Sequence, residues 1–348
     1  MRPVPDVVDF GRRALAAVGV SDHDAGLVAD SLVAADRRGI GSHGMLRLPI
    51  YVEALRAGGI AATPDLRWTA GHGATAVLDA GGGLGQVAMA AAVDRADRLA
   101  DQHGVAVVAV QNSAHYGAGA YWTDRLTDRG MVGLLTSTTG PSVAPFGGAR
   151  PLLGTNPLTV AVPSAGAHPL TVDMATSTGA YGKIVAARNE GEPIPEGWAV
   201  DADGVPTTDP AAALSGALLP FGGAKGSGLA VLLEALAASL STAGYAHETV
   251  DIWADPSSRM NAGHLLVAID TAAFTGREHT EARVAGLQSA VRATAPPGGT
   301  VHAPGDPERA RAGAATDVVA LSDSTADALD GLADTLGLDR LQRWHHHP

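Results

Sequence analysis

The pattern of apolar residues changes twice along this chain, and the change limits the folds open to it. Apolar residues recur at three- and four-residue spacings over residues 5–70, and again over 280–295 and 323–338, which predicts amphipathic helices. Between these segments, short runs of β-branched residues predict strands. Helices at both ends and strands in the middle indicate an α+β fold whose two ends pack together as one helical layer.

The middle of the chain supplies strands and further helices. Strands at 158–162 and 169–173 are expected to pair around a turn at Ser164–Gly166, and Ile194–Thr208 is expected to form a surface hairpin. The other predicted strands are 74–80, 105–110, 132–136 and 265–269, and the predicted helices are 87–100, 119–129 and 229–240.

Composition excludes several classes of protein. The formal net charge of −12, with no cluster of lysine and arginine, argues against a nucleic-acid partner. The absence of cysteine excludes disulfides, thiolate metal sites and a cysteine nucleophile, and it fits a reducing cytoplasm. No apolar run is long enough to cross a membrane, and no H-E-x-x-H motif or carboxylate cluster predicts a metal site. We therefore expect a cytoplasmic protein of 348 residues, long enough for two domains.

The stretch DRRGIGSHGMLRLPIY at residues 36–51 contains the first candidate site. If the chain turns helical after Gly44, His43 and Arg47 share one face, because residues four apart lie one turn above each other. The pair would combine a group that exchanges protons with a planar cation suited to a carboxylate. Reduction of a 2-oxo acid requires both functions. The same stretch makes Ser42 and Tyr51 candidate substrate-binding residues.

Two glycine-rich turns precede predicted helices. Gly83–Ala88 (GLGQVA) fits the dinucleotide fingerprint, but the next strand ends in Val110-Gln111-Asn112, without the acidic residue of that motif. We therefore interpret it as a tight turn between a strand and a helix. Gly222–Gly228 (GGAKGSG) contains Lys225 before an apolar helix, and such a turn favours an anion through its free backbone N–H groups. A plain helix entry is the alternative interpretation.

Two further polar residues follow predicted strands. His115 lies between a buried strand and a helix, where α/β sheets present side chains to ligands. Asp173 ends another strand and could accept hydrogen bonds from ribose hydroxyls. Each also has a simpler interpretation, as a structural histidine and as a carboxylate that caps the next turn.

These motifs, in this order, resemble the type 2 malate/L-lactate dehydrogenase family, which includes ureidoglycolate dehydrogenase, diketogulonate reductase and piperideine-2-carboxylate reductase. The similarity covers nearly the whole chain and rests on eight ordered blocks. The blocks are ADRRGIGSHGMLRLPIYVEAL, NSAHYGAGAYW, APFGGARPLLGTNPL, TVDMATSTGAYGKI, IPEGWAVDADGVPTTDP, ALLPFGGAKGSGLA, NAGHLLVAID and APGDPERA.

The resemblance implies a fold distinct from the Rossmann fold. It implies a mixed-sheet domain at residues 73–284 that binds NAD or NADP, and a helical domain built from residues 1–72 and 285–348. It also implies a homodimer whose active site lies near the subunit interface.

The resemblance further implies roles for single residues. His43 and His115 match two catalytic histidines, the second being the proton acceptor of ureidoglycolate dehydrogenases, and Arg47 matches the arginine that binds the substrate carboxylate. Two positions depart from the family pattern, since Asp306 stands where Glu or Gln is usual and Gly140 where the ureidoglycolate enzyme has an acid. The matching cofactor contacts are Thr139, Asp173, Met174, Ala175, Lys225, Gly226, Pro304, Gly305 and Asp306.

The resulting prediction is an NAD(P)-dependent oxidoreductase that moves hydride between nicotinamide and C2 of a small 2-hydroxy or 2-oxo acid. One alternative is a cyclic imino acid reductase, in which C=N replaces C=O, and another is a catalytically silent metabolite-binding protein. The intact histidines and arginine, together with Lys225, argue against a silent protein. Neither the substrate nor the choice between NAD and NADP follows from the sequence.

Overall fold

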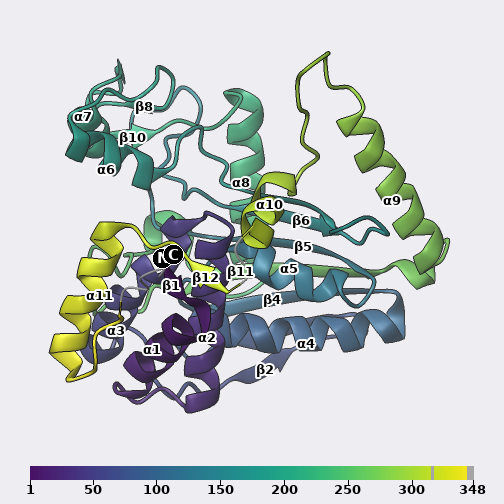
Figure 1. Ribbon diagram of the computed structural model, residues 1–348, viewed down its shortest axis with the longest axis horizontal. Coiled ribbons are helices and arrows are strands. Elements are labelled where there is room, and N and C mark those ends of the chain that lie inside the picture. Colours follow the sequence, from purple (N-terminus) through teal and green to yellow (C-terminus); the bar gives the residue numbers. More distant parts are fainter. Residues whose placement is uncertain (315–316, 343–348) are drawn as a thin grey trace, which may run out of the picture.

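A mixed sheet of seven strands forms the centre of the computed structural model, which describes residues 1–314 and 317–342 (Figure 1). The strand order is β2-β3-β4-β11-β5-β6-β7, in which the β3–β4 pair is parallel and the other pairs are antiparallel. The sheet confirms the predicted mixed α+β architecture. The strands are β2 (Arg67–Ala70), β3 (Thr75–Asp79), β4 (Val105–Ser113), β5 (Met131–Ser137), β6 (Leu158–Val162), β7 (Leu170–Met174) and β11 (Ala262–Asp270).

Strand β11 lies at the middle of the sheet although it is the last of the seven strands in sequence. It pairs with β4 on one side and with β5 on the other, and most of its residues are buried. A continuous apolar strand of this kind is typical of a position covered on both faces. Every strand expected from the sequence is confirmed, and the pairing expected around Ser164–Gly166 is the antiparallel β6–β7 hairpin.

Strand β2 lies within the segment whose pattern predicts helices, so that prediction is wrong for residues 67–70. All four residues are exposed, and the strand therefore lacks the alternation of buried and exposed side chains that a sequence reveals. Because β2 pairs with β3, the sheet begins before residue 73.

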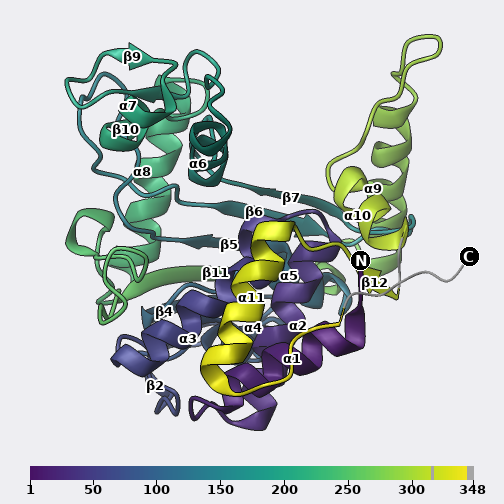
Figure 2. The same cartoon turned by 60° about the vertical axis from the view of Figure 1, so that its left-hand side comes forward.

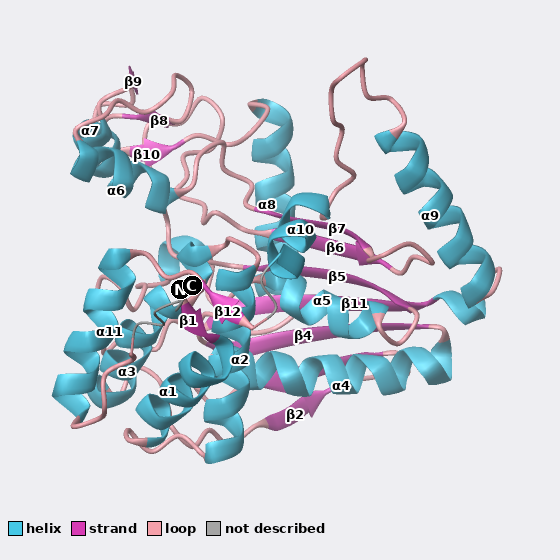
Figure 3. Cartoon of the chain, viewed as in Figure 1, coloured by secondary structure: helices cyan, strands magenta, loops and turns pink. Residues whose placement is uncertain are grey.

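Helices cover both faces of the sheet. Helices α4 and α5 pack on one face and α8 on the other (Figure 2). Beyond α8 lies a small unit in which a three-stranded sheet packs with α6 and α7 (Figure 3). Its β8–β9 pair confirms the hairpin expected over Ile194–Thr208. The bounds are α4 (Gly85–His103), α5 (Gly119–Thr127), α6 (Tyr181–Glu190), β8 (Ala199–Val200), β9 (Pro206–Thr207), α7 (Pro210–Ser215), β10 (Ala217–Leu218) and α8 (Ala224–Ser239).

The two ends of the chain share one hydrophobic core. Buried side chains from α1, α2 and α3 pack with those of α11, among them Phe10, Tyr51 and Leu329. Helix α9 packs instead against the β6–β7 turn, where Ser164 Oγ donates to Gln288 Oε1 at 2.7 Å. The bounds are β1 (Arg2–Pro3), α1 (Val4–Ala16), α2 (Asp22–Arg37), α3 (Leu48–Ala57), α9 (Arg277–Arg292), α10 (Asp306–Ala314), β12 (Val318–Val319) and α11 (Asp323–Leu336).

Among the residues that the structure describes, no helix is both long and apolar enough to cross a bilayer. In the same residues, no three His, Cys, Asp or Glu side chains gather as a metal site would require. The last part of the segment 285–348 that is predicted to be helical, residues 343–348, lies outside the described residues.

Candidate functional site

The helix predicted around His43 is instead a pair of 3-10 turns, separated by Gly44 in an extended conformation with φ −91° and ψ −151°. The expectation that His43 and Arg47 stack one α-helical turn apart is therefore wrong. A different contact orients Arg47, whose Nε donates to the carbonyl oxygen of Ser42 at 2.5 Å. The two turns span Gly41–His43 and Met45–Arg47.

Asp36, near the end of α2, holds these turns in place. Its Oδ2 accepts a hydrogen bond from the backbone N–H of Met45 at 2.7 Å. A Cβ on Gly44 would lie 2.0 Å from Asp36 Oδ1, so the close approach requires glycine. Burial raises the pKa of Asp36 to about 7, and the Met45 N–H opposes that rise. The turns that present His43 are thus fixed by the partly buried carboxyl group of Asp36.

His115 follows β4 and lies beside His43. The two ring centroids are 5.4 Å apart in a stacked arrangement. The hydroxyl of Tyr51 lies 2.6 Å from His115 Nδ1 and accepts a hydrogen bond from Gln86 Nε2 at 3.2 Å. Tyr51 is fully buried, so it contacts His115 from the protein interior. The fold therefore brings both predicted histidines together, with a buried tyrosine that orients one of them.

Both histidines are held in the neutral form. Burial, and then the charge of Arg47, lowers the pKa of His43 to about 4. The same two causes come first in lowering the pKa of His115 well below its usual value. Both residues are partly exposed, and neither Nε2 has a hydrogen-bond partner within residues 1–314 and 317–342. A neutral imidazole with a free nitrogen can exchange a proton with a bound substrate.

Two residues that the sequence does not single out complete this cluster. The Arg47 guanidinium lies 4.0 Å from the centroid of the Trp253 ring, which meets His115 edge-on at 5.7 Å. Burial raises the pKa of Asp251, while the Trp253 N–H and the charge of Arg47 lower it. Both residues come from the loop before β11, far along the chain from Arg47, and no local pattern marks them.

One predicted cofactor residue, Asp173, lies near the end of the edge strand β7. Its carboxylate accepts hydrogen bonds from Thr159 Oγ1 at 2.7 Å and from the Ala120 N–H at 2.9 Å. Burial raises the pKa of Asp173, and these two donors oppose the rise. The Ala120 contact satisfies a free N–H in the first turn of α5, so Asp173 caps that helix. Next to it, the predicted contact Met174 keeps 39% of its surface exposed.

A second predicted cofactor segment, Pro304–Asp306, lies alongside the same strand. The Thr171 N–H donates to the carbonyl oxygen of Pro304 at 3.3 Å, and Gly305 takes a φ of +93° against Thr171. The Asp306 carboxylate accepts hydrogen bonds from Arg292 at 2.7 and 2.8 Å. The residue that departs from the family pattern is therefore engaged in an ion pair.

The turn that contains Lys225 lies at the other end of β7. Phe221 N–H donates to the carbonyl oxygen of Thr176 at 3.0 Å, which brings the turn next to the end of the strand. Gly222 and Gly223 take positive φ values of 59° and 62°, and Lys225 lies in the first turn of α8. A lysine beside a helix N-terminus is suited to an anion such as a pyrophosphate.

Thr139 connects β7 to the cluster around Arg47. Its Oγ1 accepts from the Thr155 N–H at 2.9 Å, and the Thr155 carbonyl accepts from the Thr176 N–H at 2.8 Å. On the other side, a Cβ on Gly140 would lie 3.2 Å from the Cβ of Asp251. The predicted cofactor segments thus form one row that ends beside the two histidines, an arrangement that fits an elongated dinucleotide.

A buried histidine under this site makes stability depend on pH. His264 on β11 is fully buried between Ser137 Oγ at 2.8 Å and Ser113 Oγ at 2.9 Å. Burial lowers its pKa from 6.5 to about 4. Below pH 6.5 the unfolded chain takes up a proton that the folded chain does not, so stability falls as pH falls towards about 4. The loss is about 3 kcal/mol, because each pKa unit corresponds to about 1.4 kcal/mol.

Urea unfolding at several pH values between 7.5 and 4 measures this effect. We expect His264→Asn, which cannot titrate, to be less stable at pH 7.5 but to lose less stability on acidification than the wild type. Equal pH slopes for the two proteins would remove His264 as the cause.

Gly85 allows the segment of His115 to pack closely on α4. A Cβ at Gly85 would lie 2.3 Å from the Ala114 carbonyl oxygen and 2.6 Å from that of His115. The glycine of the fingerprint-like motif thus has a packing role in a turn between a strand and a helix. We expect Gly85→Ala to lower the free energy of unfolding by about 1–3 kcal/mol and to reduce turnover, because the His115 backbone must move.

The matched control is Gly286→Ala in α9, where a new Cβ meets no atom within 4 Å. That change is expected to be neutral or to stabilise by up to about 1 kcal/mol. Thermal unfolding and the rate constant kcat measure both variants. Unchanged stability and turnover in Gly85→Ala would contradict the packing role.

Comparisons with known proteins agree on one family. The profile described as malate/L-lactate dehydrogenase matches residues 3–330. The chain is 40% identical over 271 residues to a (2R)-3-sulfolactate dehydrogenase (NADP(+)) of Chromohalobacter salexigens, covering 77% of this chain and 81% of the relative. It is 38% identical over 264 residues to the ureidoglycolate dehydrogenase (NAD(+)) of Escherichia coli, covering 76% of this chain and 75% of that protein.

The fold comparison gives the same result. The structure of sulfolactate dehydrogenase from Methanocaldococcus jannaschii superposes with a TM-score of 0.91 at 36% sequence identity. The superposition covers 97% of this chain and 98% of the other, so no large part of either fold is left out.

Proposed function

The chain belongs to the malate/L-lactate dehydrogenase family and is an NAD(P)-dependent oxidoreductase of hydroxy acids, and from that premise we propose that His43, Arg47 and His115 form its active site. The nicotinamide cofactor, when bound, donates or accepts a hydride at C2 of a 2-hydroxy or 2-oxo acid. The observation that supports this site most strongly is the meeting of two neutral imidazoles, 5.4 Å apart, beside one guanidinium.

We assign the two histidines to the substrate oxygen. One exchanges a proton with it and the other donates a hydrogen bond to it. The contact with Tyr51 favours His115 for the exchange, because a hydroxyl 2.6 Å from Nδ1 can donate to the neutral ring or accept from the protonated ring. Tyr51 would therefore act through His115 and not by touching the substrate. Ser42, whose Oγ lies 3.0 Å from His43 Nδ1, would orient that ring in the same way.

Arg47 would bind the substrate carboxylate. Its Nε is already engaged by the Ser42 carbonyl, and its plane lies over Trp253, so the guanidinium has a fixed orientation. A fixed planar fork binds a carboxylate through two hydrogen bonds, which orients C2 for reaction. The exposed side of Trp253 would form one wall of the substrate site.

The cofactor would lie along β7. We propose that Lys225 and Gly226 neutralise the pyrophosphate, with Thr139 towards the nicotinamide end and Pro304–Asp306 towards the adenosine end. Asp173, Met174 and Ala175 would lie between them. Lys225 supports this arrangement, because it is exposed in the first turn of α8, where a helix N-terminus favours an anion.

Oxidation of NADH and of NADPH, followed separately at 340 nm, tests the function. The panel contains oxaloacetate, pyruvate, 3-sulfopyruvate, a bulky 2-oxo acid and a cyclic imine carboxylate. Turnover with an oxo acid but not with the imine supports the proposed reaction. Turnover confined to the imine would support the alternative, a cyclic imino acid reductase. In that reaction Arg47 would bind the carboxylate in the same way, and C=N would accept the hydride in place of C=O.

We also propose a homodimer with the active site near its interface. An exposed apolar surface supports it, since Val231 and Leu232 on α8 are 49% and 55% exposed and Phe146 near the start of that helix is 64% exposed. Such a group of apolar side chains is typical of a buried contact between subunits. Sedimentation velocity of the wild type and of Leu232→Lys tests this, and a monomeric wild type would contradict it.

The division into domains is proposed on similar grounds. We propose that residues 1–72 and 285–348 form a helical domain beside the cofactor-binding domain at 73–284, supported by the core that α1, α2 and α3 share with α11. Strand β2 and helix α9 are exceptions, because both pack with the central sheet. A cytoplasmic location stays a prediction, to be tested by cell fractionation.

A further inference from the structure

The proposed substrate site contains a carboxylate that has no part in the proposed reaction. It belongs to Asp251, whose Oδ1 accepts a hydrogen bond from the Trp253 N–H at 3.1 Å. The Trp253 ring in turn lies 4.0 Å from the Arg47 guanidinium. On its other side Asp251 lies beside Gly140, which follows the predicted cofactor contact Thr139. The carboxylate thus lies between the predicted substrate arginine and the predicted nicotinamide end of the cofactor row.

The Asp251 carboxylate is open to a ligand. In the part of the chain that the structure describes, no side chain pairs with it, and its hydrogen-bond donors are the backbone N–H groups of Ile252 and Trp253. A Cβ at Gly140 would lie 3.2 Å from the Asp251 Cβ and 3.4 Å from Oδ2, so a larger residue would crowd the carboxylate. Asp251 is partly exposed, and a carboxylate has about four acceptor positions, so it can accept further hydrogen bonds from a bound molecule.

Arg47 and Asp251 determine the charge of this site. Burial raises the pKa of Tyr51 to about 12, and the charge of Arg47 opposes that rise whereas the charge of Asp251 adds to it. Both charges therefore act on the group that contacts His115. His43 and His115 are themselves neutral, because burial lowers the pKa of each. Before a substrate binds, the site thus holds one positive and one negative charge.

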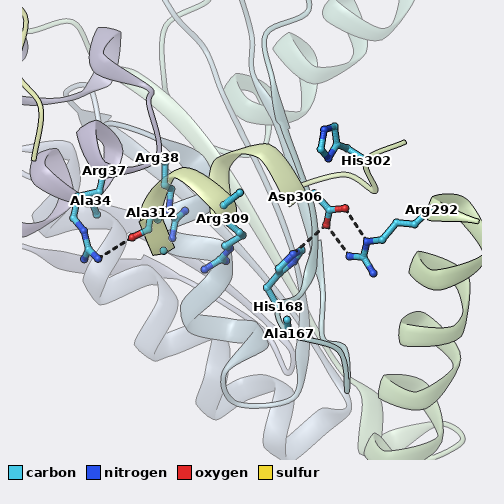
Figure 4. A pocket seen from close by; sticks show the side chains of 12 residues that line it. Ala34, Arg37, Arg38, Ala167, His168, Arg292, His302, Asp306, Arg309 and Ala312 are labelled. Atoms are coloured by element: carbon cyan, nitrogen blue, oxygen red, sulfur yellow. Dashed lines mark hydrogen bonds and ion pairs between the residues drawn. The ribbon is translucent and has the colours of Figure 1, made fainter. Parts of the chain in front are cut away.

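The arginines around α10 lie too far away to offset this carboxylate. Arg292 and His168 pair with Asp306 at 2.7 and 3.1 Å (Figure 4). His168 lies in the turn before β7, whereas Thr139 is linked to the segment that follows the strand. The five residues of β7 span about 16 Å, which exceeds the distance of about 10 Å over which salt screens exposed charges. These cations therefore leave the charge balance of the substrate site unchanged.

We propose that Asp251 selects the substrate by charge, so that the enzyme prefers 2-oxo and 2-hydroxy acids with one negative charge to dicarboxylates and other dianions. The inference rests on the proposed active site. Arg47 would pair with the single carboxylate of a monoanion. A second anionic group would find no cation to pair with, and Asp251 would repel it. A neutral group that donates hydrogen bonds, such as an amide or a hydroxyl, could instead bind to Asp251.

Two substrates of similar size that differ by one charge test this inference. Oxaloacetate has two negative charges and its 4-amide has one. We expect kcat/KM of the wild type, with saturating NADH or NADPH, to be at least about tenfold higher for the 4-amide, because repulsion between two charges in a partly buried site acts over several ångströms. Asp251→Asn keeps the shape of the side chain and removes the charge, so it should reduce this ratio about tenfold.

The matched control is Asp255→Asn, in the same loop. Its carboxylate is exposed and accepts a hydrogen bond from the Ser257 N–H at 2.9 Å. The ratio in this variant should equal that of the wild type. An equal or higher kcat/KM for oxaloacetate in the wild type would overturn the inference, and so would a ratio that Asp251→Asn leaves unchanged.

Binding of inert analogues gives a measurement that needs no turnover. Succinate and succinamate lack the reacting oxygen at C2 and differ by one charge. In calorimetric titrations of the full-length protein saturated with NADH or NADPH, succinamate should bind more tightly to the wild type, and Asp251→Asn should abolish the difference. That result without turnover on any oxo acid would leave this inference standing and contradict the proposed reaction. Tighter binding of succinate by the wild type would contradict the inference itself.

Discussion

Replacing His115 by alanine is expected to lower kcat by about 10²–10⁴-fold while the nicotinamide cofactor still binds. The ring lies 5.4 Å from that of His43 and has a free Nε2, and its lowered pKa keeps it neutral near neutral pH. The side chain is partly exposed, so its loss removes a proton-transfer group without a large packing defect. Stopped-flow turnover and titration of NADPH fluorescence measure the two effects separately.

Tyr51→Phe is the companion variant. It removes the hydroxyl 2.6 Å from His115 Nδ1 but keeps the buried ring, so we expect a smaller fall in kcat and a shifted pH profile. Turnover like that of the wild type in His115→Ala would exclude this histidine from proton transfer and leave His43 as the sole candidate. Loss of cofactor binding in His115→Ala would instead indicate a structural defect.

Arg47→Ala is expected to lower kcat/KM for a 2-oxo acid by about 10²–10⁴-fold. Two hydrogen bonds between a guanidinium and a carboxylate contribute about 1.5–3 kcal/mol each, and every 1.4 kcal/mol is a factor of ten. Arg47→Lys should recover little of this loss. Lysine cannot donate from Nε to the Ser42 carbonyl and present two further donors in the plane above Trp253.

The control for this pair is Arg56→Ala on the exposed side of α3, which should leave the kinetics unchanged. Steady-state kinetics with a 2-oxo acid, and with its amide as a neutral analogue, distinguish a carboxylate clamp from a general loss of structure. The amide should be a poor substrate for the wild type and for Arg47→Ala alike. An unchanged preference for the acid in Arg47→Ala would contradict the clamp.

The local parts of this site could be predicted from the sequence, and the long-range parts could not. The stretch containing His43 and Arg47 predicts part of the site, because it combines a residue that exchanges protons with a cation suited to a carboxylate. Its predicted helix is wrong because Asp36 packs under Gly44, a contact that spacing alone does not reveal. The sequence does not predict Trp253 as a site residue for a different reason. No local pattern distinguishes it, and only the fold brings it to Arg47.

The same distinction holds for the fold. A continuous run of β-branched residues predicts a buried strand such as β4, whereas the four exposed residues of β2 show no such pattern. Strand order is set by pairing between distant segments, so no local pattern places β11 between β4 and β5. The arginines that surround α10 likewise come from three separate stretches of sequence, and only the meeting of α2, α9 and α10 brings them together; they are Arg37, Arg38, Arg292 and Arg309.

The central position of β11 has a consequence for how the protein is made. A ribosome releases β4 and β5 long before residues 262–270, so until then both strands have an open backbone edge in the middle of the future sheet. Open edges recruit other strands, and pairing between distant segments is slow. The unfinished chain is therefore most prone to aggregate just before β11 emerges, and chaperones that bind nascent chains would have their greatest effect at that length.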